Sequence, residues 1–542
     1  MIRKCLRWTS RYFAILVIAA TYAWASITIL TNRAAQEPAG AITLRLCHWQ
    51  LETSVREAFE ELAADYRREV NPDVYIIQDA IPESTYGQWC STQLMGGTAP
   101  DIVEIGKGLP SYVWVSYLNR YFIPLSREVG KPNPYNRGTD LEGVPLAGTF
   151  KDQMRNGYVD EMQEYMTVPL SQFIVRIFYN KDLLRKLTGS ENAPTDYRQF
   201  LAACAKIAAQ KDASGRPYVP NAGSGYHFGL WEWLMFDSLT YSAIRKADFN
   251  RDGYLGNDEL FVGVKSGLIG LDFPAYRAKF QMVREVTDFF PAGYTGLGRD
   301  DAVFLFAQQK AVFMVTGTWD ARSLQELAKG KFEVGVMDFP LPARDDPEYG
   351  PYIEGPVYDK ASVGIPLAIN RKCRHPDIAM DFLRYLAGKK ANEKFNRIAG
   401  WIPAIRNTEK VDFLKGFEPH MEGVYAAMNP AIGGETWIKW SQLYSLYKVR
   451  QVDFDGMIRQ FDPFYRERGY EDFLEMQRDW RRGMQGNEQF LTDIRARALM
   501  AGGTAASELW AKYLALTAAR QVWNEIGHAR QMRMIEKGPD SK

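Results

Sequence analysis

Residues 248–259, which read DFNRDGYLGNDE, place oxygen-bearing groups at the spacing of a calcium-binding loop. Calcium takes about six to eight oxygen ligands, and a twelve-residue loop supplies them from positions 1, 3, 5, 7, 9 and 12. Gly253 at position 6 permits the sharp turn, and Gly256 at position 9 leaves that place to a water. The expected ligands are the side chains of Asp248, Asn250 and Asp252, the carbonyl of Tyr254 and both oxygens of Glu259.

A single loop of this kind favours a structural role for calcium (Ca2+). Calcium sensors usually use paired loops that open a Met-rich groove, and the sequence holds no second loop. We therefore expect calcium to brace the segment around the loop rather than to act as the signal.

Composition narrows the chemistry that the rest of the chain could perform. Lys and Arg number 66 against 65 for Asp and Glu, so no basic excess indicates a nucleic-acid partner. The five His form no metalloprotease motif, and neither a nucleophile elbow nor a P-loop occurs. The Cys spacing fits no zinc pattern. Cys47 and Cys90 could pair in an oxidising compartment or remain buried thiols, and the sequence leaves both open.

The N-terminus has the charge pattern of an export signal. A basic stretch, residues 3–11, precedes an uncharged apolar run over residues 12–30. The motif AWA at Ala23–Ala25 suits cleavage by signal peptidase, but the run is also long enough to span a bilayer. Residues 1–33 are therefore a signal peptide or a signal anchor, followed by a linker over 34–40. In both cases the remaining chain is expected to be periplasmic or extracytoplasmic.

Alternating strand and helix patterns predict an α/β fold. Apolar residues alternate in ITLRLCHW from Ile42 and recur at helical spacing in SVREAFEELAADY, and DVYIIQ and APDIVEIG predict two more strands. This order is typical of a parallel sheet with helices on its faces, which binds ligands beyond the carboxyl ends of its strands. A second α/β pattern begins near Thr167, and the chain is mainly helical after residue 409.

An ordered set of segments resembles the bacterial extracellular solute-binding proteins of family 1, in the carbohydrate-binding, maltose-binding-protein-like branch. The matching segments are ITLRLCHW, NPDVYIIQ, TAPDIVEIG, LNRYFIPLS, VPLSQFIVRIFYNKDLLRKL, FLFAQQKAVFMVTGTW, VGIPLAINRKCRHPDIAMDFLRYLAG and AGWIPAIRN. Gln309 stands where the family commonly has Gly, and the EF-hand-like loop and the last sixty or so residues look like additions.

The resemblance implies a two-lobed periplasmic-binding-protein fold (type II-like). Lobe one would comprise residues 41–165 plus 358–408, and lobe two residues 166–357 plus 409–483, with a helical extension over 484–542. Hinges are expected near residues 167–169, 361–363 and 405. The lobes would close on a sugar, and contacts to both lobes would stabilise the closed state.

The resemblance also assigns candidate sugar-binding residues. Sugar rings offer an apolar C–H face to an aromatic plane and a rim of hydroxyls to carboxylates and amides. The substrate-binding candidates are Trp49, Glu104, Trp231, Trp233, Trp319, Asp320, Trp401, Trp437 and Trp440. The alternative for each Trp is a place in the core, because Trp is large and usually mostly buried.

Three functions remain open from the sequence. The first is a monomeric solute-binding protein that delivers a carbohydrate, most simply an oligosaccharide, to an ABC permease without catalysis. The second is a membrane-tethered sugar sensor that uses the long C-terminal helix for docking, although that helix could equally pack against lobe two. The third is a calcium-dependent polysaccharide-active enzyme, since the chain is rich in carboxylates and such enzymes use a pair of them.

Overall fold

The computed structural model describes residues 21, 41–106, 114–251, 253–359, 362–417, 419–420, 422–425 and 428–538. Within these ranges, no helix combines the length and the apolar character needed to span a bilayer. The expected signal or anchor and the linker lie outside them, apart from Thr21.

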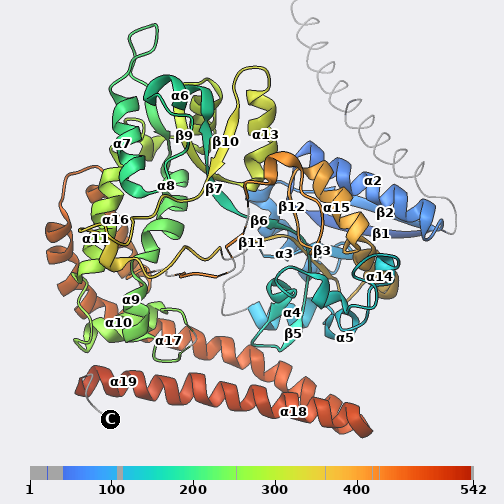
Figure 1. The fold of residues 1–542 in the computed structure, drawn as a ribbon. Coiled ribbons are helices and arrows are strands. Elements are labelled where there is room, and N and C mark those ends of the chain that lie inside the picture. Colours follow the sequence, from blue (N-terminus) through green and yellow to red (C-terminus); the bar gives the residue numbers. More distant parts are fainter. Residues whose placement is uncertain are drawn as a thin grey trace, which may run out of the picture.

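The described chain forms two lobes, each built on its own sheet (Figure 1). The sheet of lobe one has six strands in the order β12-β6-β11-β3-β1-β2. Strand β1 pairs in parallel with β2 and β3, whereas β11 runs antiparallel to β3 and β6. The strands are β1 (Ile42–His48), β2 (Val74–Ala80), β3 (Ile102–Glu104), β6 (Val168–Phe173), β11 (Ser362–Ile369) and β12 (Ile402–Pro403).

Helices cover the sheet of lobe one with their apolar faces. Helix α2 (Thr53–Glu69) buries Val55, Phe59, Leu62 and Tyr66, which recur at helical spacing. The other helices used below are α3 (Glu83–Gly96), α4 (Trp114–Tyr121), α14 (Pro376–Leu386) and α15 (Lys389–Ala399).

Lobe two has a four-stranded sheet in the order β10-β7-β9-β8. Its strands are β7 (Val175–Asn180), β8 (Val219–Ala222), β9 (Ala311–Gly317) and β10 (Val334–Met337). Its helices include α6 (Lys181–Thr188), α7 (Tyr197–Ala208), α8 (Gly225–Trp231), α9 (Tyr241–Ala247), α10 (Asn257–Lys265), α11 (Pro274–Thr287), α12 (Arg299–Ala307), α13 (Thr318–Ala328) and α16 (Gly434–Lys448).

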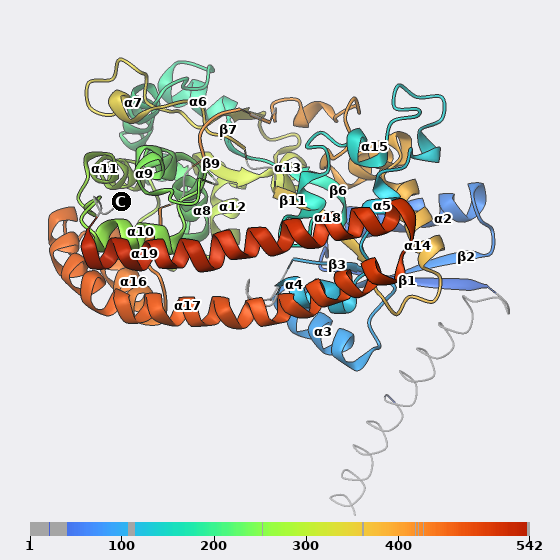
Figure 2. The ribbon, with the colours of Figure 1, turned by 90° about the horizontal axis from the view of Figure 1, so that it is seen from below.

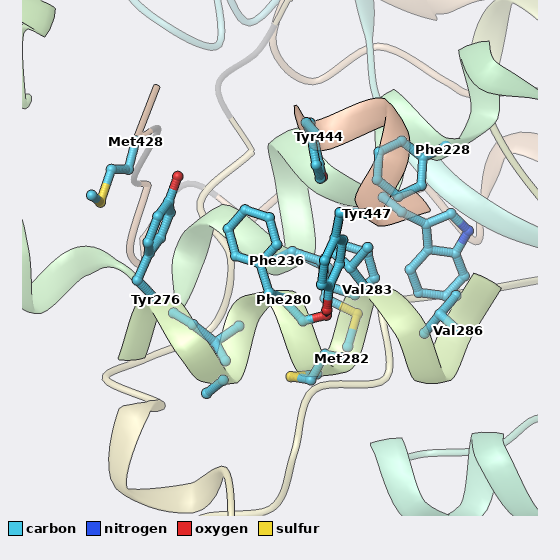
Figure 3. Close-up of a cluster of buried hydrophobic side chains, with 14 of the residues drawn as sticks. Phe228, Phe236, Tyr276, Phe280, Met282, Val283, Val286, Met428, Tyr444 and Tyr447 are labelled. Atoms are coloured by element: carbon cyan, nitrogen blue, oxygen red, sulfur yellow. The ribbon is translucent and has the colours of Figure 1, made fainter. Parts of the chain in front are cut away.

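Aromatic rings hold the helical layer of lobe two together. Phe280 of α11 packs edge-on against Tyr444 and Tyr447 of α16, with ring centroids 5.4 and 5.1 Å apart (Figure 3). Tyr447 also donates a 2.7 Å hydrogen bond to the carbonyl of Phe280. Helix α16, which follows the last crossing in sequence, is therefore part of the core of lobe two.

The chain crosses between the two sheets near three places. Strand β6 belongs to lobe one and β7 to lobe two, so the first crossing lies at Ile174. This differs from the boundary after residue 165, because VPLSQF pairs with β11 before the chain leaves the first sheet. The second crossing lies between Asp359 and β11, and the third follows the bridge between Phe150 and Ile405.

A buried ion pair joins the three crossing segments on the side of lobe two. Arg176, two residues after the first crossing, is 1% exposed and donates from Nη1 and Nη2 to Asp359, at 2.8 and 2.5 Å. Asp359 directly precedes the second crossing and also accepts the backbone N–H of His420, beyond the third, at 2.8 Å. Arg176 Nε lies 2.6 Å from a carboxylate oxygen of Asp338.

A long helical hairpin, residues 454–537, follows the two lobes and runs along both of them (Figures 1 and 2). It consists of α17 (Phe454–Met500), α18 (Gly503–Arg520), the π-helical turn η9 (Gln521–Ile526) and α19 (Gly527–Lys537). The final stretch therefore does not pack on lobe two alone, because its return helix also contacts lobe one.

Replacing Arg176 with Met should lower the free energy of unfolding of lobe two by about 3–5 kcal/mol, because Asp359 would stay buried without its cation. Guanidinium-induced unfolding followed by tryptophan fluorescence would measure the loss. Lys415→Met is the control, since its ion pair with Asp412 lies at the surface. Equal unfolding midpoints for the two variants would contradict a stabilising role for Arg176.

Candidate functional site

Aromatic side chains from both lobes meet at the first crossing. Phe173, the last residue of β6, packs edge-on against Trp319 of lobe two at 5.7 Å and against Trp401 of lobe one at 4.9 Å. Trp319 is half-buried at the start of α13, whereas Trp401 is 3% exposed in the core of lobe one. Trp401 is thus a structural support rather than the stacking surface expected, and Trp319 keeps an exposed part.

Polar groups of lobe two surround Trp319. Asp320 accepts a 2.6 Å hydrogen bond from Thr316 Oγ1 and forms an ion pair with Arg299, at the start of α12. The guanidinium carbon of Arg299 lies 5.7 Å from the ring centroid of Tyr226, at the start of α8. Helices α8, α12 and α13 therefore bring a phenol, a guanidinium, an indole and a carboxylate together. Asp320 is nearly buried and holds the guanidinium of Arg299 in place.

Tyr226 remains a hydrogen-bond donor at neutral pH. Burial of its phenol group raises the pKa to about 12. The positive charge of Arg299 lowers this pKa, and the negative charges of Asp320 and Glu83 raise it further. Glu83 belongs to lobe one, where it begins α3 just after β2. The charge of Glu83, in lobe one, therefore raises the pKa of a phenol group in lobe two.

On the side of lobe one, Glu104 positions the segment that follows β1. Its carboxylate is fully buried and accepts the backbone N–H of Trp49 at 3.1 Å and Nε2 of Gln50 at 2.8 Å. Tyr86 donates to the Glu104 carbonyl at 2.7 Å, and its ring lies 5.1 Å from that of Trp49. Glu104 therefore holds Trp49 at the strand end, where the half-buried indole keeps an exposed part.

The remaining tryptophan candidates divide into buried and exposed pairs. Trp231 is fully buried against Phe200, and Trp440 is 8% exposed against Phe461, so neither offers a free face for stacking. Trp233 and Trp437 are each 60% exposed. Their elements, the π-helical turn η5 (Glu232–Phe236) and α16, are joined by a 2.8 Å hydrogen bond from the Tyr444 hydroxyl to the Glu232 carboxylate.

The loop at residues 248–259 adopts a tight turn closed by its first carboxylate. Asp248 accepts the backbone N–H groups of Arg251 at 2.5 Å and Gly253 at 2.9 Å. Gly253 has φ +84°, a conformation that favours glycine. Asp252 lies outside the described residues. Among those that are described, no three His, Cys, Asp or Glu side chains are placed to hold a metal ion.

The carboxylate at the last position of the loop points back into the turn. Glu259 is 2% exposed and accepts backbone N–H groups of Phe249 at 2.8 Å, Asn250 at 3.0 Å and Gly256 at 3.0 Å. Burial raises the pKa of Glu259 to about 7. The hydrogen bonds from Phe249 and Asn250 hold this buried carboxylate against the first half of the loop.

Cys47 and Cys90 are free thiols in the described structure, as are Cys204 and Cys373, and all four are buried. Burial raises the pKa of the Cys90 thiol to about 11, so it stays protonated at neutral pH. The hydroxyl of Tyr86 lies 3.4 Å from Cys47 Sγ.

Sequence reasoning missed Tyr226, Arg299 and Glu83. Glu83 and Tyr226 each begin a helix after a strand, β2 and β8, and this is the edge at which α/β sheets bind ligands. That rule could have indicated both residues. Arg299 carries no such signal, since its role follows from its ion pair with Asp320.

Comparison with known proteins places the chain in a family. The family model described as bacterial extracellular solute-binding protein matches residues 51–393. No curated protein matches the chain.

Solved structures share its fold. A complex of the solute-binding protein RafE with raffinose is 18% identical, with a TM-score of 0.54, and the alignment covers 79% of this chain and 99% of that one. Apo RafE from Streptococcus pneumoniae is also 18% identical, with a TM-score of 0.53, and the alignment covers 80% of this chain and 99% of that one. The MalE domain from Bdellovibrio bacteriovorus bound to maltotriose is 16% identical, with a TM-score of 0.52 over 78% of this chain and 98% of that one. Because the family model spans more than half of the sequence, the chain belongs to the bacterial extracellular solute-binding protein family.

Proposed function

We propose that the protein captures an oligosaccharide between its two lobes outside the cytoplasm and delivers it to an ABC permease. The observation that carries this proposal is the group of Trp319, Tyr226, Arg299 and Asp320 next to the first crossing. Raffinose and maltotriose are the sugars named for similar structures, which supports a saccharide as the ligand class.

The chemistry of this group suits a polyhydroxylated ligand. The indole of Trp319 would stack against the C–H face of a sugar ring, a contact worth about 1 kcal/mol beyond the area it buries. The Tyr226 hydroxyl and the Arg299 guanidinium donate hydrogen bonds, and carboxylates such as Glu83 accept them from hydroxyl groups. A sugar that contacts Glu83 in lobe one and Trp319 in lobe two would stabilise the closed state by its differential affinity.

Binding without catalysis is the simpler reading of these residues. Asp320 is held by Arg299 and Thr316, and Glu104 by backbone and amide groups, so each of these carboxylates already has a positioning role. A membrane-tethered sensor that binds sugar at the same site is the second candidate, in which the outer side of the hairpin would serve as the docking element. We expect the protein to be a monomer.

We further propose that the 248–259 loop binds calcium through Asp248, Asn250, Asp252, the Tyr254 carbonyl and Glu259. Support comes from the closed turn at Asp248 and from the buried carboxylate of Glu259. A bound cation would offset the cost of burying the charged form of that carboxylate.

Trp319→Ala should weaken saccharide binding about tenfold or more, because stacking and apolar burial would both be lost. Isothermal titration calorimetry with raffinose, maltotriose and longer maltodextrins would measure this. Trp480→Ala is the matched control, since Trp480 is an exposed indole on α17. Unchanged affinity in Trp319→Ala would exclude this residue from the site, and cleavage of any of these sugars by the wild type would favour an enzyme.

EDTA should lower the melting temperature of the wild type by about 2–5 °C, since a ligand that binds only the folded state stabilises it. In Asp252→Ala and Glu259→Gln, EDTA should cause no further drop. Differential scanning calorimetry in EDTA and in excess calcium would show both effects. A wild type that melts at the same temperature in both buffers would contradict calcium binding by this loop.

A further inference from the structure

The C-terminal hairpin, residues 454–537, contacts both lobes along its length. Helix α17 has 47 residues, which corresponds to about 70 Å at the rise of an α-helix. Helices α18 and α19 return alongside it, so the hairpin crosses the molecule twice (Figure 2). A single stiff element is therefore in contact with both sides of the crossings.

Its attachment to lobe two is apolar and fully buried. Phe461, Tyr465 and Phe473 of α17 have no exposed surface. Phe473 stacks on Phe261 of α10 with ring centroids 5.3 Å apart. On the return helix, Met534 of α19 joins the same core. This end of the hairpin is part of lobe two rather than a separate module.

The attachment to lobe one is smaller but also buried. Phe490, Leu491 and Ile494 of α17 and Leu516 of α18 pack in one cluster with residues of α3 and α4. Lys512 of α18 forms an ion pair with the Glu164 carboxylate and donates to the Gln163 carbonyl at 3.1 Å. Rotation of the lobes about the crossings would have to break or shift these contacts.

The last helix of the hairpin is fastened to the calcium-type loop. Gln531 of α19, 8% exposed, donates from Nε2 to the Asp258 carboxylate at 2.7 Å. Arg530 donates to the carbonyl of Phe249 at 3.4 Å, and the N–H of Phe249 is bound by Glu259. The loop and α19 are thus joined by two hydrogen bonds, in addition to the apolar contact of Met534 with the core.

We infer that the hairpin is a strap that holds the two lobes at one preset angle, and that the 248–259 loop locks its return helix in place. The inference rests on the proposed function, because it makes calcium a regulator of saccharide affinity at the interlobe site. A strap that presets the angle reduces the conformational freedom lost when a sugar binds, and so raises affinity.

The test measures the distance between the lobes without any sugar. Spin labels are placed in the full-length protein at Glu57→Cys on α2 and Lys206→Cys on α7, both exposed, in a Cys5→Ser background. The four buried thiols are left in place. Double electron–electron resonance in millimolar calcium should give one narrow distance distribution for the otherwise unchanged chain.

Release of the lobe-one end should broaden that distribution. Lys512→Glu opposes Glu164 with a like charge and should roughly double the width, because more lobe angles become accessible. The charge swap Lys512→Glu with Glu164→Lys should restore the narrow distribution. Arg520→Ala is the matched control, since its ion pair with Glu488 lies within the hairpin. A width that stays unchanged both in Lys512→Glu and in Ile494→Asp overturns the strap.

Removal of calcium should loosen the hairpin at its lobe-two end, where α19 contacts the 248–259 loop. EDTA should broaden the wild-type distribution, and Gln531→Ala should be equally broad in calcium, with no further change in EDTA. A wild-type distribution that EDTA leaves unchanged overturns the link between the loop and the strap.

Calorimetry on the same samples separates this inference from the proposed function. Binding of raffinose or maltotriose should be about threefold or more weaker in Lys512→Glu than in Arg520→Ala. Distance changes in a protein that binds neither sugar would count against the proposed function and support the strap. Sugar binding with equal affinity and equal distances in all variants would count against the strap alone.

Discussion

A buried pair, Arg176 and Asp359, ties together the three chain segments that cross between the lobes. Two charges that leave water lose much hydration, and only good geometry with further hydrogen bonds compensates for it. Here both nitrogens of the guanidinium fork meet the carboxylate, and the N–H of His420 occupies a further acceptor position. Arg176 follows the first crossing, Asp359 precedes the second and His420 follows the third. Their hydrogen bonds therefore join the ends of all three crossing segments in lobe two.

The first crossing is itself tied to lobe two. Ile174 is held by Thr318, whose N–H donates to the Ile174 carbonyl at 2.9 Å, so α13 begins directly at the crossing. This explains why Trp319 and Asp320, the next two residues, lie beside the junction. Phe173 then spans from Trp319 to Trp401, and one aromatic ring connects the site with the cores of both lobes.

The sequence predicts the class of the fold better than it predicts which side chains are buried. The α/β class follows from the strand and helix patterns, which depend on neighbours in the chain, and the two lobes follow from the resemblance. Trp231 and Trp233 are two residues apart, yet one is fully buried and the other 60% exposed. That difference arises from the π-helical turn and from packing against Phe200 and Phe236, which no spacing encodes. The first crossing, at Ile174, lies beyond the expected hinge at residues 167–169, because Val168–Phe173 still pairs with β11 in the sheet of lobe one.

A stiff element across a hinge changes what ligand binding has to accomplish. In a binding protein with free lobes, the sugar must supply the free energy that orders them. If apolar contacts at both ends of the hairpin fix the angle between the lobes, the lobes are ordered when the protein folds. The sugar then needs to supply less free energy and only has to fill the site. The smaller contact, at Lys512 and Leu516 in lobe one, is then the natural place for release. The loop at the opposite end is hydrogen-bonded to the return helix. If calcium fixes that loop, as we propose, it would influence sugar binding without touching the sugar.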